Sequence, residues 1–96
     1  MDFGLSKKQL LLISEKLKSE NVKKAVIFGS RAKGNYRLNS DIDIAVFGVS
    51  NLGKLISELD ELPLPYKFDV VSYENIYHGP LREHIDRVGV IIYEPS

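Results

Sequence analysis

Apolar and polar residues along the chain follow two periods, one of three to four residues and one of two. The longer period is typical of a helix with one buried face. It covers the segments 7–19, 52–62 and 80–88. The shorter period, together with short apolar runs, is typical of strands. It covers 24–28, 41–47, 67–72 and 90–93. The pattern therefore predicts the element order α-β-β-α-β-α-β.

Residues that begin or end helices flank the three helical segments. Ser6 and Gln9 form a capping-box pattern at the start of the first segment. Pro63 ends the second segment because proline cannot continue a helix, and Pro80 suits the first turn of the third. The polar stretch 31–40 predicts a loop, or one helical turn followed by a loop.

The element order predicts one mixed sheet of four strands flanked by helices, an α/β (α+β) fold, in a single domain over residues 1–96. Only a loop joins the strands 24–28 and 41–47, so we expect these two strands to run antiparallel. Helical crossovers precede the strands 67–72 and 90–93, and such crossovers permit parallel pairs.

Composition narrows the class of protein. The 96 residues include no cysteine, which excludes disulfide frameworks and thiolate zinc sites. No apolar run approaches the roughly 18 residues of a membrane span, so we expect a soluble cytoplasmic domain with no membrane partner. The formal net charge is zero, but residues 1–37 carry nine Lys/Arg against three Asp/Glu, and residues 38–96 carry four against ten. This asymmetry is a hint of an anionic ligand or of an interface.

Two aspartates lie two residues apart in an alternating strand. Asp41 and Asp43 therefore share one face, and a pair of such acids is able to bridge a hard cation. Asp69 is a third acid in an apolar run, and the three carboxylates share one patch if the two strands are neighbours. Repulsion of about 4 kcal/mol for charges ~4 Å apart would then require a cation or a raised pKa. The alternative is a strand start in solvent, where screening removes most of this repulsion.

Gly29 and Ser30 follow directly after the apolar run 24–28. A strand that ends in Gly-Ser offers backbone N–H groups and a hydroxyl to phosphate oxygens, and Arg31 and Lys33 add positive charge. The segment is neither a P-loop, because the required Lys-Ser/Thr is absent, nor a dinucleotide fingerprint. The alternative is an ordinary turn.

Other residues give weaker signals. His78 and His84 lack metal-ligand spacing to each other and to the acids, so we expect ordinary surface or helix-face histidines. Ser30 has no His or Lys partner by spacing, which disfavours a hydrolase nucleophile. The aromatic residues are scattered, with no base-stacking pattern, and a direct nucleic-acid ligand is disfavoured.

Together, the Gly-Ser pair and the Asp-x-Asp pair form one pattern, GSRAKGNYRLNSDIDIAV, with ten residues between Ser30 and Asp41. This segment resembles the nucleotidyltransferase motif of the DNA polymerase β superfamily, most closely its minimal nucleotidyltransferase (MntA-like) branch. The resemblance runs from about Leu5 to Tyr93 and includes the third acid in Phe68-Asp69-Val70-Val71. It implies the nucleotidyltransferase core fold.

The resemblance also implies roles for the acids. Asp41, Asp43 and Asp69 correspond to catalytic carboxylates that bind two Mg²⁺ ions. Asp69 would also help to remove the proton of the acceptor hydroxyl.

By the same resemblance, the Gly-Ser side of the motif would bind the nucleotide. Gly29 and Ser30 would contact the triphosphate of ATP, and Arg31 and Lys33 would neutralise the leaving pyrophosphate.

Minimal nucleotidyltransferases resemble antitoxins that are paired with a helical HEPN ribonuclease. The resemblance implies transfer of AMP from ATP to a hydroxyl, expected to be that of a tyrosine, on such a toxin. Two alternatives stay open at this point. One is a non-catalytic, nucleotide-binding antitoxin that neutralises its partner by contact, and the other is transfer to a small molecule or a nucleic acid.

Overall fold

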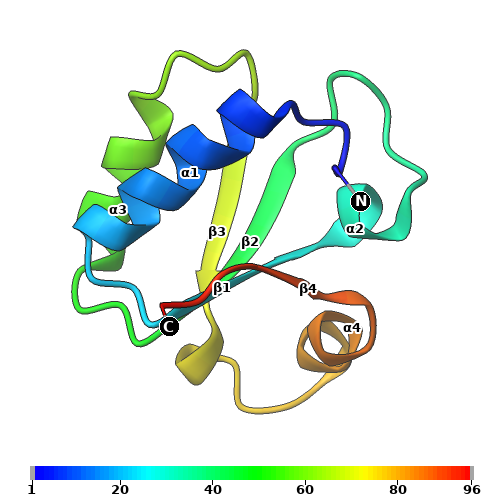
Figure 1. The fold of residues 1–96 in the computed structure, drawn as a ribbon. Helices are drawn as coiled ribbons and strands as arrows, with labels where there is room; N and C mark the ends of the chain where they lie inside the picture. Colours follow the sequence, from blue (N-terminus) through cyan, green and yellow to red (C-terminus); the bar gives the residue numbers. More distant parts are fainter. Residues whose placement is uncertain (1, 96) are drawn as a thin grey trace.

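The computed structural model describes residues 2–95 and has a four-stranded sheet with helices on both faces (Figure 1). Its elements follow the predicted order with two short additions, the helix α2 and the 3₁₀ turn η1. In chain order they are α1 (Lys7–Ser19), β1 (Lys24–Phe28), α2 (Gly29–Lys33), β2 (Ile42–Phe47), α3 (Leu52–Asp60), β3 (Phe68–Ser72), η1 (Tyr73–Asn75), α4 (Pro80–Val88) and β4 (Val90–Tyr93). The helical turn that was one of two expectations after the first strand is thus present as α2.

The strand order in the sheet is β3-β2-β1-β4. β1 and β2 run antiparallel, and β2 and β3 run parallel, so the predicted mixed sheet is confirmed. β4 pairs antiparallel with β1. The crossover through α4 carries the chain from β3 at one edge of the sheet to β4 at the other edge, where β4 pairs with β1. The three pairings together make β4 parallel to β3, although the two strands are not neighbours.

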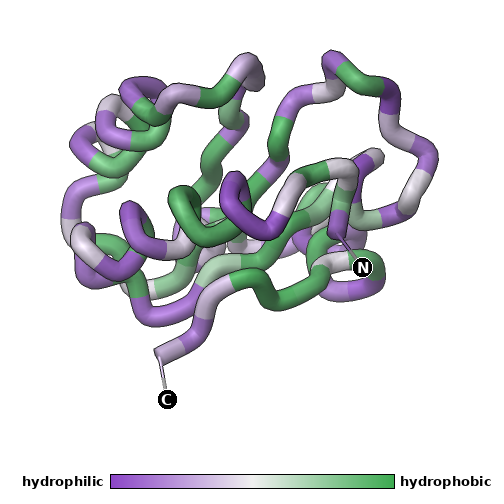
Figure 2. The backbone as a smooth tube through the Cα atoms, turned by 45° about the horizontal axis from the view of Figure 1, so that its top comes forward, coloured by the Kyte–Doolittle hydropathy of each residue, from purple (hydrophilic) through white to green (hydrophobic). Residues whose placement is uncertain are grey.

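Two apolar layers lie on the two faces of the sheet. The larger one joins Ile44 and its neighbours on alternate positions of β2 to Ile13 and Leu17 of α1 and Leu55 and Leu59 of α3. The smaller one joins Ala45 and parts of β1 to Ile85 of α4 (Figure 1). The strands are mainly hydrophobic along the tube of Figure 2, while the helices carry hydrophilic and hydrophobic residues within the same turns. Period-two alternation therefore divides each central strand between two cores.

The helix ends follow local side-chain chemistry. The hydroxyl oxygen of Ser6 accepts the N–H of Gln9 at 3.1 Å, and the Gln9 side chain accepts the N–H of Ser6 at 2.9 Å. This pair is the predicted capping box. Asn51 caps α3 by accepting the N–H of Lys54 at 3.0 Å, and Pro80 opens α4. Among residues 2–95, no helix combines the length and the apolar character that a bilayer crossing demands.

Candidate active site

The three acids lie at the same end of the sheet. Asp43 is in β2 and is in register with Phe28 of β1 on one side and with Asp69 of β3 on the other. Asp41 lies two residues before Asp43, just ahead of β2. Side chains at paired positions of neighbouring strands point to the same face, so Asp43 and Asp69 share the face that α4 covers. The two strands are thus neighbours, as the shared patch requires.

Burial and charge act together on Asp43. Its side chain is partly buried between β1 and β3, whereas Asp41 and Asp69 are exposed. Burial, followed by the charges of Asp69 and Asp41, raises the pKa of Asp43 to about 6, and the charge of Arg31 opposes the rise. The carboxylate is therefore destabilised by its own surroundings at neutral pH.

The raised pKa predicts a specific pH dependence of stability. Because the folded chain holds the Asp43 proton more tightly than the unfolded chain, this group adds stability as the pH falls through about 6 and destabilises above it. Without divalent cations, we expect Asp43→Asn to raise the free energy of unfolding at pH 7.5 by about 1–2 kcal/mol, after allowance for solvent screening. The gain should disappear near pH 4. Urea unfolding of both proteins across pH 4–8 measures this difference, and parallel curves would contradict it.

The Gly-Ser turn packs directly against Asp43. Gly29 follows β1 with φ +72°, a conformation that L side chains rarely adopt. A Cβ atom built on Gly29 would overlap the carboxylate oxygen Oδ2 of Asp43. Ser30 is the next residue and is partly buried in α2. Glycine is therefore needed here both for its φ angle and for the room it leaves beside the acid.

Two cations follow in α2, and the structure places them differently. Lys33 is exposed in the last turn of α2, within the reach of solvent and ligands. Arg31 is only 1% exposed, and its guanidinium donates hydrogen bonds to backbone carbonyls of Phe3, Leu38 and Ser40. A side chain that contacts pyrophosphate must be exposed at the surface. Lys33 meets this requirement, whereas Arg31 does not.

His84 contributes a contact that the sequence did not predict. The N–H of Gly29 donates to Nε2 of His84 at 3.2 Å, and the imidazole meets the Phe28 ring edge-on with centroids 6.0 Å apart. His84 thereby joins α4 to the Gly-Ser turn. The relevant contact spans 55 positions, so no local spacing could have indicated it.

We expect loss of this contact to loosen the turn. His84→Ala removes the acceptor of a partly buried N–H and should lower the free energy of unfolding by about 1–2 kcal/mol. His78→Ala, at an exposed position, should change it by less than about 0.5 kcal/mol. Chemical denaturation of the two variants provides the comparison, and equal losses would show that the Gly29 contact contributes nothing.

Comparison with models of protein families identifies the family of this chain. The model described as "Polymerase beta, Nucleotidyltransferase" matches residues 12–96. The chain belongs to this nucleotidyltransferase family. The family prediction made from the Gly-Ser and Asp-x-Asp motif is thus confirmed. No curated protein matches the nucleotidyltransferase chain.

Solved structures confirm the fold of this nucleotidyltransferase. One, described as "Crystal structure of the toxin-antitoxin with AMP-PNP", superposes with a TM-score of 0.70 at 21% identity and covers 91% of this chain and 74% of the other. A second, a mutant of the toxin–antitoxin MntA–HpeT, has a TM-score of 0.67 at 18% identity with the same coverage. At these identities the likeness shows the nucleotidyltransferase fold.

The acids of the nucleotidyltransferase fit a divalent cation by their chemistry. Carboxylate oxygens are the preferred ligands of Mg²⁺, and a cation would relieve the repulsion that Asp43 experiences. Within residues 2–95, no three His, Cys, Asp or Glu side chains lie close enough together to hold a metal ion as they stand. A bound ion would therefore have to draw Asp41, Asp43 and Asp69 together.

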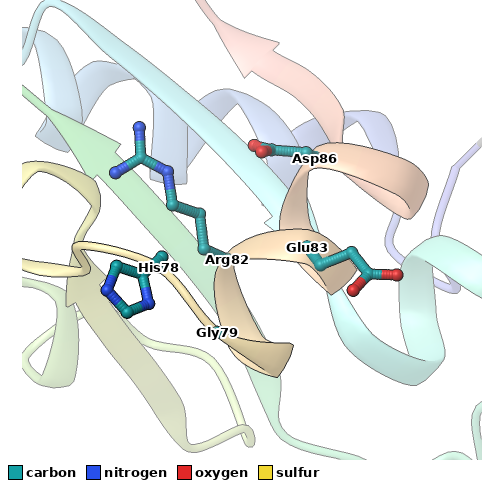
Figure 3. Close-up of a pocket in the computed structure, with 5 residues that line it drawn as sticks. All are labelled: His78, Gly79, Arg82, Glu83 and Asp86. Carbon is teal, nitrogen blue, oxygen red and sulfur yellow. The ribbon is translucent and has the colours of Figure 1, made fainter.

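A separate open pocket of about 340 Å³ lies beside α4 of the nucleotidyltransferase, lined by His78, Gly79, Arg82, Glu83 and Asp86 (Figure 3). The arginine of this pocket forms hydrogen bonds within the chain. Arg82 donates to the carbonyls of Ile76 and Tyr77 at 2.7 and 2.9 Å and to the hydroxyl of Tyr73 at 3.0 Å. In Figure 3, Glu83 points away from Arg82 and His78. Arg82 therefore holds the segment before α4 in place, and the pocket shares no lining residue with the carboxylate site.

Proposed function

We propose that this chain is a metal-dependent nucleotidyltransferase that transfers AMP from ATP to a hydroxyl, expected to be that of a tyrosine, on a partner HEPN toxin, and so acts as the antitoxin. The observation that carries the proposal is the packing of the Gly29 turn against Asp43, with Asp69 in register on the next strand. This packing joins a phosphate-binding type of turn to a carboxylate patch in a chain of the nucleotidyltransferase family. The two toxin–antitoxin structures with the same fold, one of them with AMP-PNP, support the choice of nucleotide and partner.

In this proposal the residues divide the reaction between them. Gly29 leaves room for the triphosphate beside the backbone, while its own N–H is donated to His84. Ser30 contacts the triphosphate through its backbone N–H and its hydroxyl, and Lys33 balances the charge of the leaving pyrophosphate. Asp41, Asp43 and Asp69 would hold two Mg²⁺ ions, which supply charge neutralisation at the attacking and leaving oxygens.

In the proposed reaction, one bond to the α-phosphorus forms and one breaks. The acceptor hydroxyl oxygen bonds to the α-phosphorus as the bond from the α-phosphorus to the bridging oxygen breaks. Pyrophosphate leaves, and the hydroxyl proton passes to the Asp69 carboxylate. The exposed position of Asp69 at the sheet edge leaves it accessible to an acceptor on another protein.

Label transfer tests this function directly. The chain is incubated with ATP labelled at the α-phosphate, Mg²⁺ and the folded product of the neighbouring gene. Covalent label on the partner, a mass increase of one AMP and a modified tyrosine in peptide mapping are expected. No transfer to a folded partner would overturn the proposal, and label on an added nucleic acid or small molecule instead would redirect it.

One observation favours a second function, neutralisation by contact alone. The carboxylates among residues 2–95 are not assembled as a ready three-ligand metal site. A non-catalytic, nucleotide-binding antitoxin would still protect cells from the toxin when Asp41 and Asp43 are both asparagine. Loss of protection in that variant, with complex formation intact, would rule this function out.

A further inference from the structure

Arg31 is the one charged or polar side chain that is buried among the described residues 2–95. Its guanidinium carbon lies over two aromatic rings, 4.7 Å from the centroid of Tyr66 and 5.3 Å from that of Tyr36. The ion pairs of the described residues are Lys16–Glu58 and Lys54–Glu20, so no carboxylate there lies within ion-pair distance of Arg31, and the charge of Asp43 acts on it only from further away. Burying a charge without a carboxylate in direct contact is costly, and the fold offsets this cost through polar contacts.

Those polar contacts join two distant segments. Nη1 of Arg31 donates to the carbonyl of Phe3 at 2.9 Å. Nη2 donates to the carbonyl of Ser40 at 2.8 Å and to that of Leu38 at 3.4 Å, while Nε donates to Ser40 at 3.2 Å. A planar guanidinium is suited to this task because its donors point in fixed directions. A single side chain thus fixes both the N-terminal segment and the segment 38–40.

The segment 38–40 leads directly into the carboxylate site. Ser40 precedes Asp41, and a further bond, from the N–H of Arg37 to the hydroxyl of Ser40 at 2.8 Å, closes the turn there. Arg31 itself lies in α2, two residues after Gly29. The arginine therefore ties the Gly-Ser turn to the backbone that carries the first acid.

We propose that Arg31 is a positioning residue for nucleotidyl transfer, which sets the place of Asp41 relative to the Gly-Ser turn and makes no contact with the triphosphate. The proposal rests on the proposed function in one respect, that Asp41 is a metal ligand. A role through Asp41 differs from the phosphate role that the motif resemblance implies for Arg31, because it predicts loss of metal binding rather than loss of nucleotide binding.

Three variants separate these roles. Arg31→Met keeps a long side chain and removes every donor, whereas Arg31→Lys keeps the charge but cannot reach both segments with one fork. Arg37→Met is the matched control, since it removes a neighbouring exposed arginine charge. The readouts are amide hydrogen exchange, Mn²⁺ binding followed by electron paramagnetic resonance, and binding of ATP in EDTA.

For Arg31→Met we expect roughly tenfold weaker Mn²⁺ binding, the size found when a residue that orients a metal ligand is removed. Amide exchange should quicken by roughly tenfold or more at residues 38–41 and 3–5, with the sheet still protected. Affinity for ATP without metal should match that of Arg37→Met. Arg31→Lys should be intermediate, and its effect on Mn²⁺ binding should vanish in an Asp41→Asn background.

Other results would overturn the proposal. Loss of metal-free ATP affinity in Arg31→Met, with unchanged exchange and Mn²⁺ binding, would make Arg31 a phosphate ligand. Unchanged values in all three measurements would show that Arg31 contributes only packing volume. If Arg31→Met does not fold, Arg31→Lys with and without Asp41→Asn decides the question. A wild-type chain that binds no Mn²⁺ would sink the metal part of the proposed function, and exchange at 38–41 would then decide whether Arg31 holds this segment.

Discussion

Changing Asp41 and Asp43 together to asparagine should abolish the proposed transfer of AMP to a partner, lowering the rate by about 1000-fold or more. The amide side chains keep the shape of the acids but lose the negative charge that would hold divalent cations, whose charge stabilisation amounts to several kcal/mol. Label transfer from ATP under saturating Mg²⁺ measures the loss.

The same variant should stay folded, which separates a chemical effect from a structural one. The two substitutions remove the charge of the partly buried Asp43 and that of Asp41, and with them the repulsion among the three acids. We therefore expect equal or higher thermal stability without metal. The matched control is Asp60→Asn with Glu61→Gln, two exposed acids at the end of α3 on the far face of the sheet. Wild-type activity in the Asp41/Asp43 variant, or loss of activity in the control pair, would contradict the assignment.

Gly29→Ala should both destabilise the fold and inactivate the enzyme. The left-handed φ of +72° costs a non-glycine residue about 1–2 kcal/mol, and the new Cβ would overlap the Asp43 carboxylate. We therefore expect a loss of about 2–4 kcal/mol in the free energy of unfolding, and a displaced acid in whatever remains folded. Urea denaturation and label transfer measure the two effects.

Gly34 provides a control for backbone strain. It has a similar φ of +89°, but a Cβ there would meet nothing within 4 Å. Gly34→Ala should therefore show only the backbone cost of about 1–2 kcal/mol and retain transfer activity. Adding Asp43→Ala to Gly29→Ala should recover the part of the stability loss that comes from overlap. Equal losses in the two single variants would show that the contact with Asp43 is unimportant.

Contacts between residues close in sequence were predictable. The capping box of Ser6 and Gln9 depends on residues three positions apart, and the structure shows both of its hydrogen bonds. Alternation along β2 placed Ile44 and Val46 on the larger core face and left Asp43 on the other. The pairing of Asp43 with Asp69 was predicted only on the condition that their strands are neighbours, which the parallel register of β2 and β3 meets.

Contacts between distant residues were not predictable in this way. Arg31 meets Phe3 across 28 positions and Gly29 meets His84 across 55, and each contact depends on how whole elements pack. The local sequence does not distinguish a buried arginine from an exposed one. The motif therefore predicted the same role, neutralising pyrophosphate, for Arg31 and Lys33. Their environments differ because the N-terminal segment and two tyrosine rings close over Arg31.

The bond between Arg31 and the carbonyl of Phe3 bears on where an expressed fragment should begin. A fragment cut at residue 12 would contain every position that the family model matches, together with all three acids and the Gly-Ser turn. It would lack Phe3 and Leu5, both buried in the larger core, and the acceptor of the 2.9 Å bond. The first five of the 13 residues of α1 would be lost with them. Residues 3–11 thus contribute to the folding unit of this chain, and a fragment that starts at the matched boundary would lack these contributions.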